Sequence, residues 1–140
     1  MLNRKTVLFL CTGNSCRSHL AEAIINARMG DQWHAVSAGT KPSGYVHPKA
    51  LAVLKEIGIT HSGESKLADQ FRDWDFDVVV TVCDSAAEEC PVWLGQGRRV
   101  HKSFPDPAEA TGSEDEILKI FRLVRDEIEA EIPQILNQFI

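Results

Sequence analysis

The sequence predicts an α/β protein with a four-stranded parallel sheet flanked by helices on both faces. Two observations support this class. The first is the presence of short apolar runs, such as Val-Leu-Phe-Leu at residues 7–10, which are typical of buried strands. The second is that these runs alternate with longer segments whose apolar residues recur every three or four positions, as in helices. Such alternation of strands and helices is typical of a parallel sheet between helical layers. The 140 residues suffice for one core and contain no internal repeat or linker, so we expect residues 1–140 to form a single domain.

The first half of the chain is expected to hold two strands and two helices in alternation. These elements are strands at residues 4–10 and 33–38 and helices at residues 18–29 and 48–57. Gly30 and Gly58 follow the helices at positions where glycine commonly forms the C-terminal cap. Pro48 suits the first position of a helix, because its missing N–H would be unpaired there in any case.

The second half is expected to begin with a short helix and to end with a long one. The expected elements are a short helix at residues 67–71, strands at 76–82 and 98–102, and a helix beginning near residue 113. Ser113 and Glu116 have the spacing of a capping box. The helix has an apolar stripe formed by Ile117, Phe121, Val124, Ile128, Ile132 and Ile135. Pro133 should bend or break this helix.

Composition and charge exclude several function classes. A net charge of −5 leaves no broad basic face, which argues against a general nucleic-acid-binding protein. The first apolar run ends at Thr12 and is too short for a signal peptide or a membrane span, so we expect a cytoplasmic protein without a membrane segment. In that compartment the four cysteines suggest catalysis, redox cycling or metal binding rather than a disulfide framework.

The loop Cys-Thr-Gly-Asn-Ser-Cys-Arg-Ser at residues 11–18 joins the first strand to the first helix. Free backbone N–H groups and the positive end of the helix dipole meet there, so the loop should bind an anion. The same field should make the Cys11 thiol easy to ionise, and a thiolate is a nucleophile. Arg17 offers a planar fork that suits two oxygens of a phosphate-like ion. The alternative, a cysteine that only packs in the core, leaves Gly13, Asn14 and Arg17 unexplained.

Two further reactive groups should lie near this loop. Cys83 directly follows the third expected strand, and Asp106 follows the fourth. In open parallel sheets, ligands bind at the carboxyl ends of the strands. Topology should therefore bring Cys11, Cys83 and Asp106 to one rim of the sheet.

These motifs resemble those of the low-molecular-weight protein tyrosine phosphatase fold. The resemblance rests on the loop at residues 11–18, on Ser37-Ala38-Gly39 and on Asp106-Pro107. Within this group the chain is more similar to the thioredoxin-coupled arsenate reductases. The narrower similarity is carried by Val80-Thr81-Val82-Cys83, Cys90-Pro91 and His47-Pro48-Lys49-Ala50.

The resemblance implies a role for each residue of the site. Cys11 would attack the arsenic of arsenate, and Asp106, aimed by Pro107, would protonate the departing oxygen. Ser18 would hydrogen-bond the Cys11 thiolate, and Asn14 would brace the loop. The residues implied to bind the oxyanion are Thr12, Gly13, Asn14, Ser15, Cys16, Arg17 and Ser18.

The resemblance also implies a relay of three cysteines. Cys83 would attack the Cys11–arsenic adduct, and Cys90 would then attack the resulting Cys11–Cys83 disulfide. Thioredoxin would reduce the final Cys83–Cys90 disulfide as an external reductant. If residues 83–90 are helical when reduced, the two Cα atoms lie roughly 10 Å apart. A disulfide needs about 7 Å or less, so residues 83–96 should unwind during turnover, with Gly95 and Gly97 as a flexible edge.

Some relatives bind potassium beside the loop through positions that align with Asn14, Glu22 and Ser37 and through an aspartate. Lys66 occupies the place of that aspartate, and its ammonium could replace the metal and pair with Glu22. We therefore expect weak or no activation by potassium. We also expect no bound cofactor and a monomeric protein.

Other assignments are less consistent with the sequence. Cys-x4-Cys and Cys-x6-Cys are poor matches to zinc spacings, and His34, His47, His61 and His101 show no ligand spacing. An exposed His19 on the helix would need no special role. Cys16 fits a packing thiol better than a redox partner of Cys11. Two other functions remain open: a phosphatase acting on phosphotyrosine or small phosphate esters, and a non-catalytic oxyanion sensor.

Overall fold

The computed structural model describes residues 4–84 and 98–139, and these contain one four-stranded parallel sheet. The strands are β1 (Lys5–Cys11), β2 (Trp33–Gly39), β3 (Val78–Thr81) and β4 (Arg98–His101), arranged in the order β2-β1-β3-β4. This result confirms the predicted sheet. Because β1 lies between β2 and β3, the chain leaves β1 toward one edge of the sheet and later crosses to the other edge.

The central position of β1 explains its continuous apolar sequence. It pairs with β2 on one side, with Cys11 opposite Gly39, and with β3 on the other, with Leu10 opposite Thr81. The four residues at positions 7–10 are fully buried. A parallel strand covered on both faces needs apolar residues throughout rather than at alternate positions.

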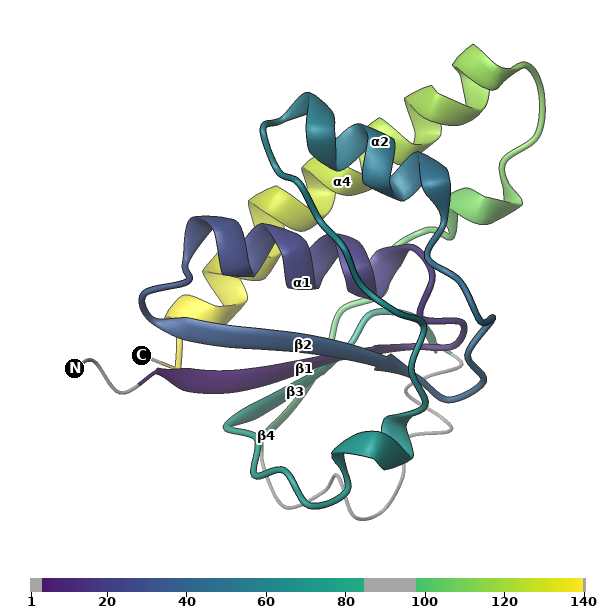
Figure 1. Cartoon of the computed structure of the whole chain (residues 1–140). Helices are drawn as coiled ribbons and strands as arrows, with labels where there is room; N and C mark the ends of the chain where they lie inside the picture. Colours follow the sequence, from purple (N-terminus) through teal and green to yellow (C-terminus); the bar gives the residue numbers. More distant parts are fainter. Residues whose placement is uncertain (1–3, 85–97, 140) are drawn as a thin grey trace.

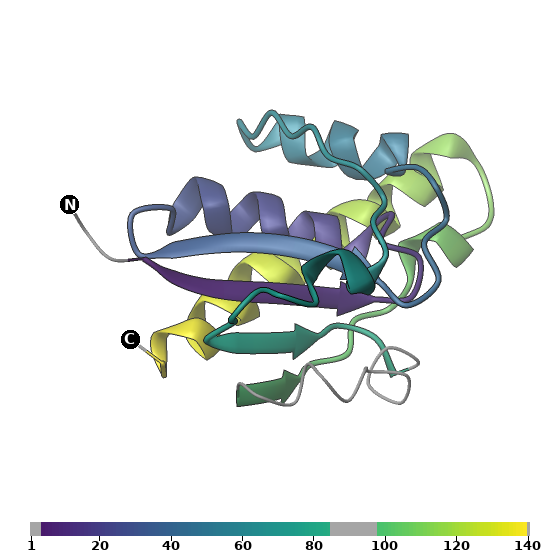
Figure 2. The ribbon, with the colours of Figure 1, turned by 60° about the horizontal axis from the view of Figure 1, so that its bottom comes forward.

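Within residues 4–84 and 98–139, the α-helices pack on one side of the sheet (Figure 1). They are α1 (Arg17–Arg28), α2 (Pro48–Glu56) and α4 (Glu114–Asn137). Figure 1 shows α1 and α4 side by side above the sheet, with α2 lying over α4. On the opposite face lies the short 3-10 helix η1 (Ala68–Phe71), which comes forward in Figure 2. This helix confirms the expected short helix near residue 67.

Helix α4 follows the predicted pattern except at its proline. Ser113 and Glu116 form the capping box, and Phe121, Ile128 and Ile132 are fully buried. The expectation that Pro133 breaks the helix is wrong, because α4 continues to Asn137. A proline removes one backbone hydrogen bond. Burial of residues on both sides of it, Ile132 and Leu136, holds the last turns in place.

An aromatic cluster covers part of the second face. The rings of Phe71 and Trp74 lie 5.1 Å apart between centroids, and those of Trp74 and Phe76 lie 5.8 Å apart. This cluster closes the core under η1.

Among the helices of the described ranges, none combines the length and apolar character that a membrane crossing requires.

Candidate active site

The loop between β1 and α1 lies where parallel sheets bind ligands. It leaves the carboxyl end of β1 at Cys11 and enters α1 at Arg17. The strand order reverses at β1, which places a crevice beside this loop. The N-cap residue of α1, Cys16, makes no side-chain capping hydrogen bond. The first N–H groups of the helix therefore stay available for an anion, as the sequence predicted.

Cys11 sits at the base of the loop with two polar contacts. Its Sγ lies 2.8 Å from Ser18 Oγ and accepts a hydrogen bond of 3.2 Å from the Asn14 N–H. Asn14 Nδ2 donates to Ser18 Oγ over 2.8 Å. The Ser18 hydroxyl thus accepts from Asn14, and its single hydrogen can point at the sulfur. This arrangement agrees with the bracing roles predicted for Ser18 and Asn14.

The electrostatics of Cys11 differ from the sequence-level expectation. Burial raises the pKa of the Cys11 thiol above its ordinary value and is the largest effect. Hydrogen bonds from Ser18 and Asn14 and the charge of Arg17 lower the pKa in opposition. The prediction of an easily ionised thiol included only the lowering effects, because sequence does not show that the side chain is 2% exposed.

Arg17 connects the loop to the acid predicted for catalysis. One guanidinium nitrogen donates to the Phe104 carbonyl over 3.1 Å, and the other lies 3.6 Å from Asp106 Oδ2. The second oxygen, Asp106 Oδ1, accepts from the Ala108 N–H and caps the 3-10 helix η3 (Pro107–Glu109). Asp106 is therefore held from both sides, with part of its carboxylate facing solvent.

Cys83 lies at the same rim as the loop. Its Sγ is 3.4 Å from Thr12 Oγ1, and the thiol is almost completely buried. A cavity of about 460 Å³ adjoins it and is lined by Thr12, Arg17, Cys83, Asp84, Ser103, Phe104, Asp106 and Glu109. The structure thus brings together the groups that the sequence placed on one rim. Cys90, residues 85–96 of the segment implied to unwind, and Gly97 lie outside the described residues.

The side of the loop away from Cys83 is held by Ser65 and Lys66. The sequence did not predict that these residues would contact the loop through hydrogen bonds. Asn14 adopts a left-handed conformation with φ of 48°, and its Oδ1 accepts from the Lys66 N–H over 2.8 Å. Ser65 Oγ donates to the Gly13 carbonyl over 2.9 Å. A Cβ on Gly39 would lie 2.5 Å from the Thr12 carbonyl, so only glycine fits at this end of β2.

Cys16 behaves as a packing thiol. It is buried, its Sγ lies 3.6 Å from Ser15 Oγ, and burial raises its pKa to about 12. Burial also raises the pKa of Cys11, so the pKa does not separate the two thiols. The contacts do, because Ser18 Oγ and the Asn14 N–H lie against the Cys11 sulfur, whereas Cys16 contacts Ser15. This difference favours the packing interpretation of Cys16.

The positions that align with a potassium site are joined by hydrogen bonds within the protein. Ser37 Oγ donates to Glu22 Oε1 over 2.9 Å, and Asn14 Oδ1 accepts from the Lys66 N–H over 2.8 Å. The Lys66 ammonium donates to the Glu64 carbonyl over 2.9 Å rather than forming the ion pair with Glu22 that we expected. Its charge still acts on Glu22, because it lowers the pKa of that carboxyl against the larger effect of burial.

The family follows from the sequence match and agrees with this geometry. The model of the low molecular weight phosphotyrosine protein phosphatase family matches residues 6–139. The chain belongs to this family.

Relatives that are similar in sequence are named arsenate reductases, whereas the solved structures with a similar fold include both arsenate reductases and a phosphatase. The arsenate reductase of Halalkalibacterium halodurans is 46% identical over 128 residues, which cover 91% of each chain. A solved structure described as an arsenate reductase in the intermediate state has a TM-score of 0.79 at 30% identity. That match covers 97% of this chain and 99% of the other. The solved structure of a low molecular weight protein tyrosine phosphatase from T. tengcongensis has a TM-score of 0.78 at 25% identity. That match covers 96% of this chain and 99% of the other.

Proposed function

We propose that this protein is an arsenate reductase in which Cys11, Cys83 and Cys90 transfer two electrons from thioredoxin to arsenate. The similarity to named arsenate reductases supports the activity. The observation that carries the mechanism is the shared cavity, because Cys83, Arg17, Thr12 and Asp106 all line it beside the loop that holds Cys11. A phosphatase needs a nucleophile and an acid at this place, whereas a second thiol there suits a redox step.

The first step is nucleophilic substitution at arsenic. The loop N–H groups and Arg17 hold the oxyanion, and the Cys11 thiolate forms a bond to arsenic while one oxygen departs. The departing oxygen belongs to a hydroxyl group of arsenate, and the proton that Asp106 gives it lets it leave as water. The Ser18 hydroxyl, 2.8 Å from Sγ, stabilises the thiolate before attack. Arsenic is still pentavalent in this adduct.

The second step is reduction. The Cys83 thiolate attacks the Cys11 sulfur, the sulfur–arsenic bond breaks, and its electron pair stays on arsenic, which leaves as arsenite. A Cys11–Cys83 disulfide remains. Cys90 attacks Cys83, frees Cys11 and forms the Cys83–Cys90 disulfide, which two electrons from thioredoxin reduce. These steps require a compartment that keeps thiols reduced, so we place the monomeric protein in the cytoplasm.

Serine variants test the relay. Cys83→Ser and Cys90→Ser should abolish multiple-turnover arsenite production with thioredoxin, thioredoxin reductase and NADPH, because each removes one thiol of the relay. Both should retain hydrolysis of p-nitrophenyl phosphate, which needs only the loop and the acid. Cys16→Ser is the matched control and should retain both activities. Sustained arsenate reduction by either relay variant would refute the mechanism.

Phosphatase activity is a second candidate, favoured by the family match and by the fit of the loop to tetrahedral oxyanions. The similar tyrosine phosphatases usually carry an aromatic residue after the Asp-Pro pair, whereas Ala108 follows Pro107 here. Tyr45 is exposed and is the only tyrosine in the chain. We therefore propose that hydrolysis of phosphate esters is a weak side activity.

We also propose that potassium does not activate the enzyme. The position that would need to supply an aspartate carboxylate holds Lys66, whose ammonium brings a positive charge close to Glu22.

A further inference from the structure

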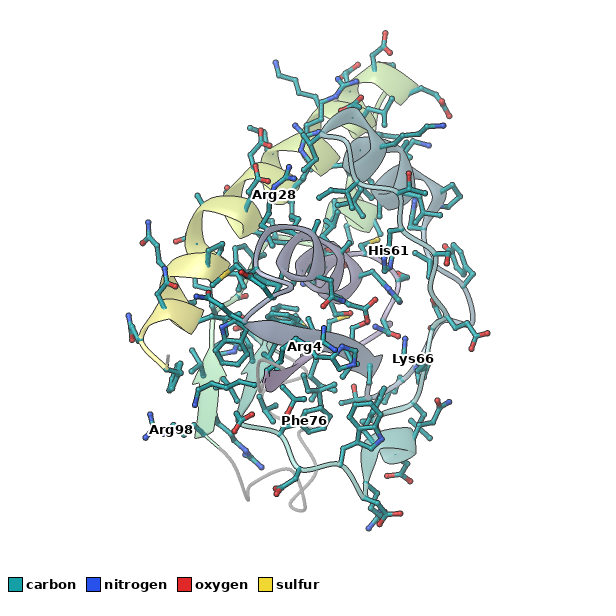
Figure 3. The ribbon with its side chains drawn as sticks, turned by 60° about the vertical axis from the view of Figure 1, so that its left-hand side comes forward. Arg4, Arg28, His61, Lys66, Phe76 and Arg98 are labelled. Carbon is teal, nitrogen blue, oxygen red and sulfur yellow. The ribbon has the colours of Figure 1, made fainter. Side chains whose placement is uncertain are left out.

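A cluster of two histidines and one glutamate lies behind the active-site loop, on the side away from Cys83. It consists of His19 and Glu22 on α1 and His61 on the segment that follows α2. Figure 3 shows His61 beside α1, with Lys66 farther along the same segment. His61 Nε2 lies 3.0 Å from His19 Nδ1 and 3.5 Å from Glu22 Oε2, and the third distance, from His19 Nδ1 to Glu22 Oε2, is 4.0 Å. Spacing in the sequence did not reveal this cluster, because 42 residues separate the two histidines.

Neighbouring groups fix the orientation of each donor. His19 Nε2 lies 3.0 Å from the Glu64 carbonyl, which can only accept, so this nitrogen carries the proton. The lone pair of the neutral ring is therefore on Nδ1, which accepts a hydrogen bond from His61 Nε2 and faces Glu22. A metal ion would take the place of the proton on His61 Nε2, and the proton of that ring would move to its other nitrogen. Ser37 donates to Glu22 Oε1 and leaves Oε2 directed at the histidines. Histidines that bind metals commonly donate their other N–H to a carbonyl in this way.

We propose that His19 Nδ1, His61 Nε2 and Glu22 Oε2 form a binding site for a divalent transition-metal ion of the zinc type. Zinc binds nitrogen and oxygen ligands at about 2.0–2.1 Å in a tetrahedron, whose edges are then about 3.3–3.4 Å. The three observed separations of 3.0, 3.5 and 4.0 Å bracket this edge length. A water molecule would complete the tetrahedron.

A glycine keeps the space beside the ligands open. A Cβ on Gly63 would lie 2.9 Å from His19 Cε1 and 3.0 Å from His61 Nε2. The backbone at this position has no left-handed φ, so the need for glycine comes from the side chains next to it. The cluster is close to solvent, because the side chains of Glu22 and His61 are 12% and 8% exposed.

The donor set selects the kind of ion. Imidazole suits zinc, copper and nickel, whereas magnesium and potassium prefer sites made of oxygens. The cluster places two imidazole nitrogens and one carboxylate oxygen within 4.0 Å of one another, which is a mixed nitrogen and oxygen set of the kind that zinc binds. The Lys66 ammonium opposes a cation here, since its charge lowers the pKa of both histidines.

Metal binding at this place would reach the active-site loop. His19 follows Ser18, the residue in contact with Cys11 Sγ, and His61 lies on the segment whose Ser65 and Lys66 hold the loop backbone. An ion that joins His61 to α1 would fasten that segment to the helix. It should therefore raise the midpoint of thermal unfolding.

Nitrogen-15 NMR of the histidine rings tests the site directly, with zinc chloride as the probe and magnesium chloride as the comparison ion. One equivalent of zinc should shift the Nδ1 signal of His19 and the Nε2 signal of His61, while magnesium shifts neither. Cysteine thiols also bind zinc, but they cannot produce this pattern of ring nitrogens. Unshifted signals for both rings with excess zinc would overturn the proposal.

Variants separate this site from other zinc binding. His61→Ala should lower zinc affinity by at least roughly tenfold and abolish the rise in melting temperature. His34→Ala is the matched control, since His34 stacks on Trp74 outside the cluster. Gly63→Ala should weaken binding without removing a ligand, and Lys66→Met should strengthen it by removing the nearby charge. Equal zinc affinities for His61→Ala and His34→Ala would contradict the assignment.

Discussion

The two sides of the active-site loop are built differently. The side facing Cys83 and Asp106 opens onto a cavity, and its main links are the guanidinium contacts of Arg17 and one contact between Thr12 and Cys83. The other side is closed, because Asn14 is fully buried and bonded to Ser18 and Lys66. The difference indicates that the two sides of the loop have different roles. The closed side fixes the shape of the loop, while the open side leaves substrate and a second thiol free to approach.

The largest effect is expected on the open side, from Arg17→Lys. Lysine keeps the charge but loses the fork that holds two oxygens, so kcat/KM for arsenate should fall by roughly a hundredfold or more. The melting temperature should change little, because the guanidinium is held at the edge of a cavity. Steady-state kinetics and thermal unfolding measure the two quantities. An Arg17→Lys variant that loses stability but keeps its kcat/KM would contradict the role in substrate binding that we assign to the open side.

The closed side should respond to Asn14→Ala in the opposite way. The change leaves the Lys66 N–H without its acceptor and removes the donor to Ser18, which should cost about 2 kcal/mol of unfolding free energy. Denaturant unfolding measures this loss. Asn26→Ala is the matched control, because the Asn26 side chain also makes two hydrogen bonds, but both are to the backbone of Ala35, far from the loop. Both variants should lose stability, and only Asn14→Ala should also lose activity.

Ser18→Ala tests the link between the two sides. The Ser18 hydrogen bond lowers the pKa of the Cys11 thiol, so its removal should shift that pKa upward and move thiolate formation to higher pH. The pH dependence of Cys11 alkylation by iodoacetamide, followed by mass spectrometry of the Cys11 peptide, measures the shift. Ser15→Ala is the control, because its hydroxyl contacts Cys16 rather than Cys11. An unchanged or lower pKa in Ser18→Ala would show that the hydroxyl does not stabilise the thiolate.

The smallest effect is expected from potassium. Replacing potassium by sodium in the assay should leave the KM for arsenate unchanged, because the Lys66 ammonium already places a positive charge close to Glu22. Lys66→Asp would supply a carboxylate and should make the KM respond to potassium. A several-fold rise in the wild-type KM in sodium would disprove the potassium proposal.

The open side was largely predictable from the sequence, and the closed side only in part. The resemblance gave Asn14 a bracing role and set Lys66 beside the loop, but it did not give the contact that joins them. Cys11, Cys83 and Asp106 each follow a strand, and parallel strands end at one rim, so local patterns were enough to place them together. Asn14 and Lys66 meet through a backbone N–H, which no residue type reveals. The contact between His19 and His61 and the burial of His19 depend on how two distant segments pack.

The remaining differences have the same origin. The pKa of Cys11 is raised by burial, a tertiary effect that the local motif does not contain. Pro133 lies inside α4 because packing on both sides outweighs one lost hydrogen bond. Gly39 was expected only as the end of a strand, whereas it also allows the Thr12 carbonyl to approach closely.

A single-turnover reaction of the Cys90→Ser variant with arsenate tests the central claim that Cys11 and Cys83 act as partners across the open side. Without Cys90 the relay should stop at its first disulfide. We predict one equivalent of arsenite and a Cys11–Cys83 disulfide in the peptide map by mass spectrometry. Release of arsenite with both thiols still free, or a disulfide that joins Cys11 to Cys16 instead, would contradict the account.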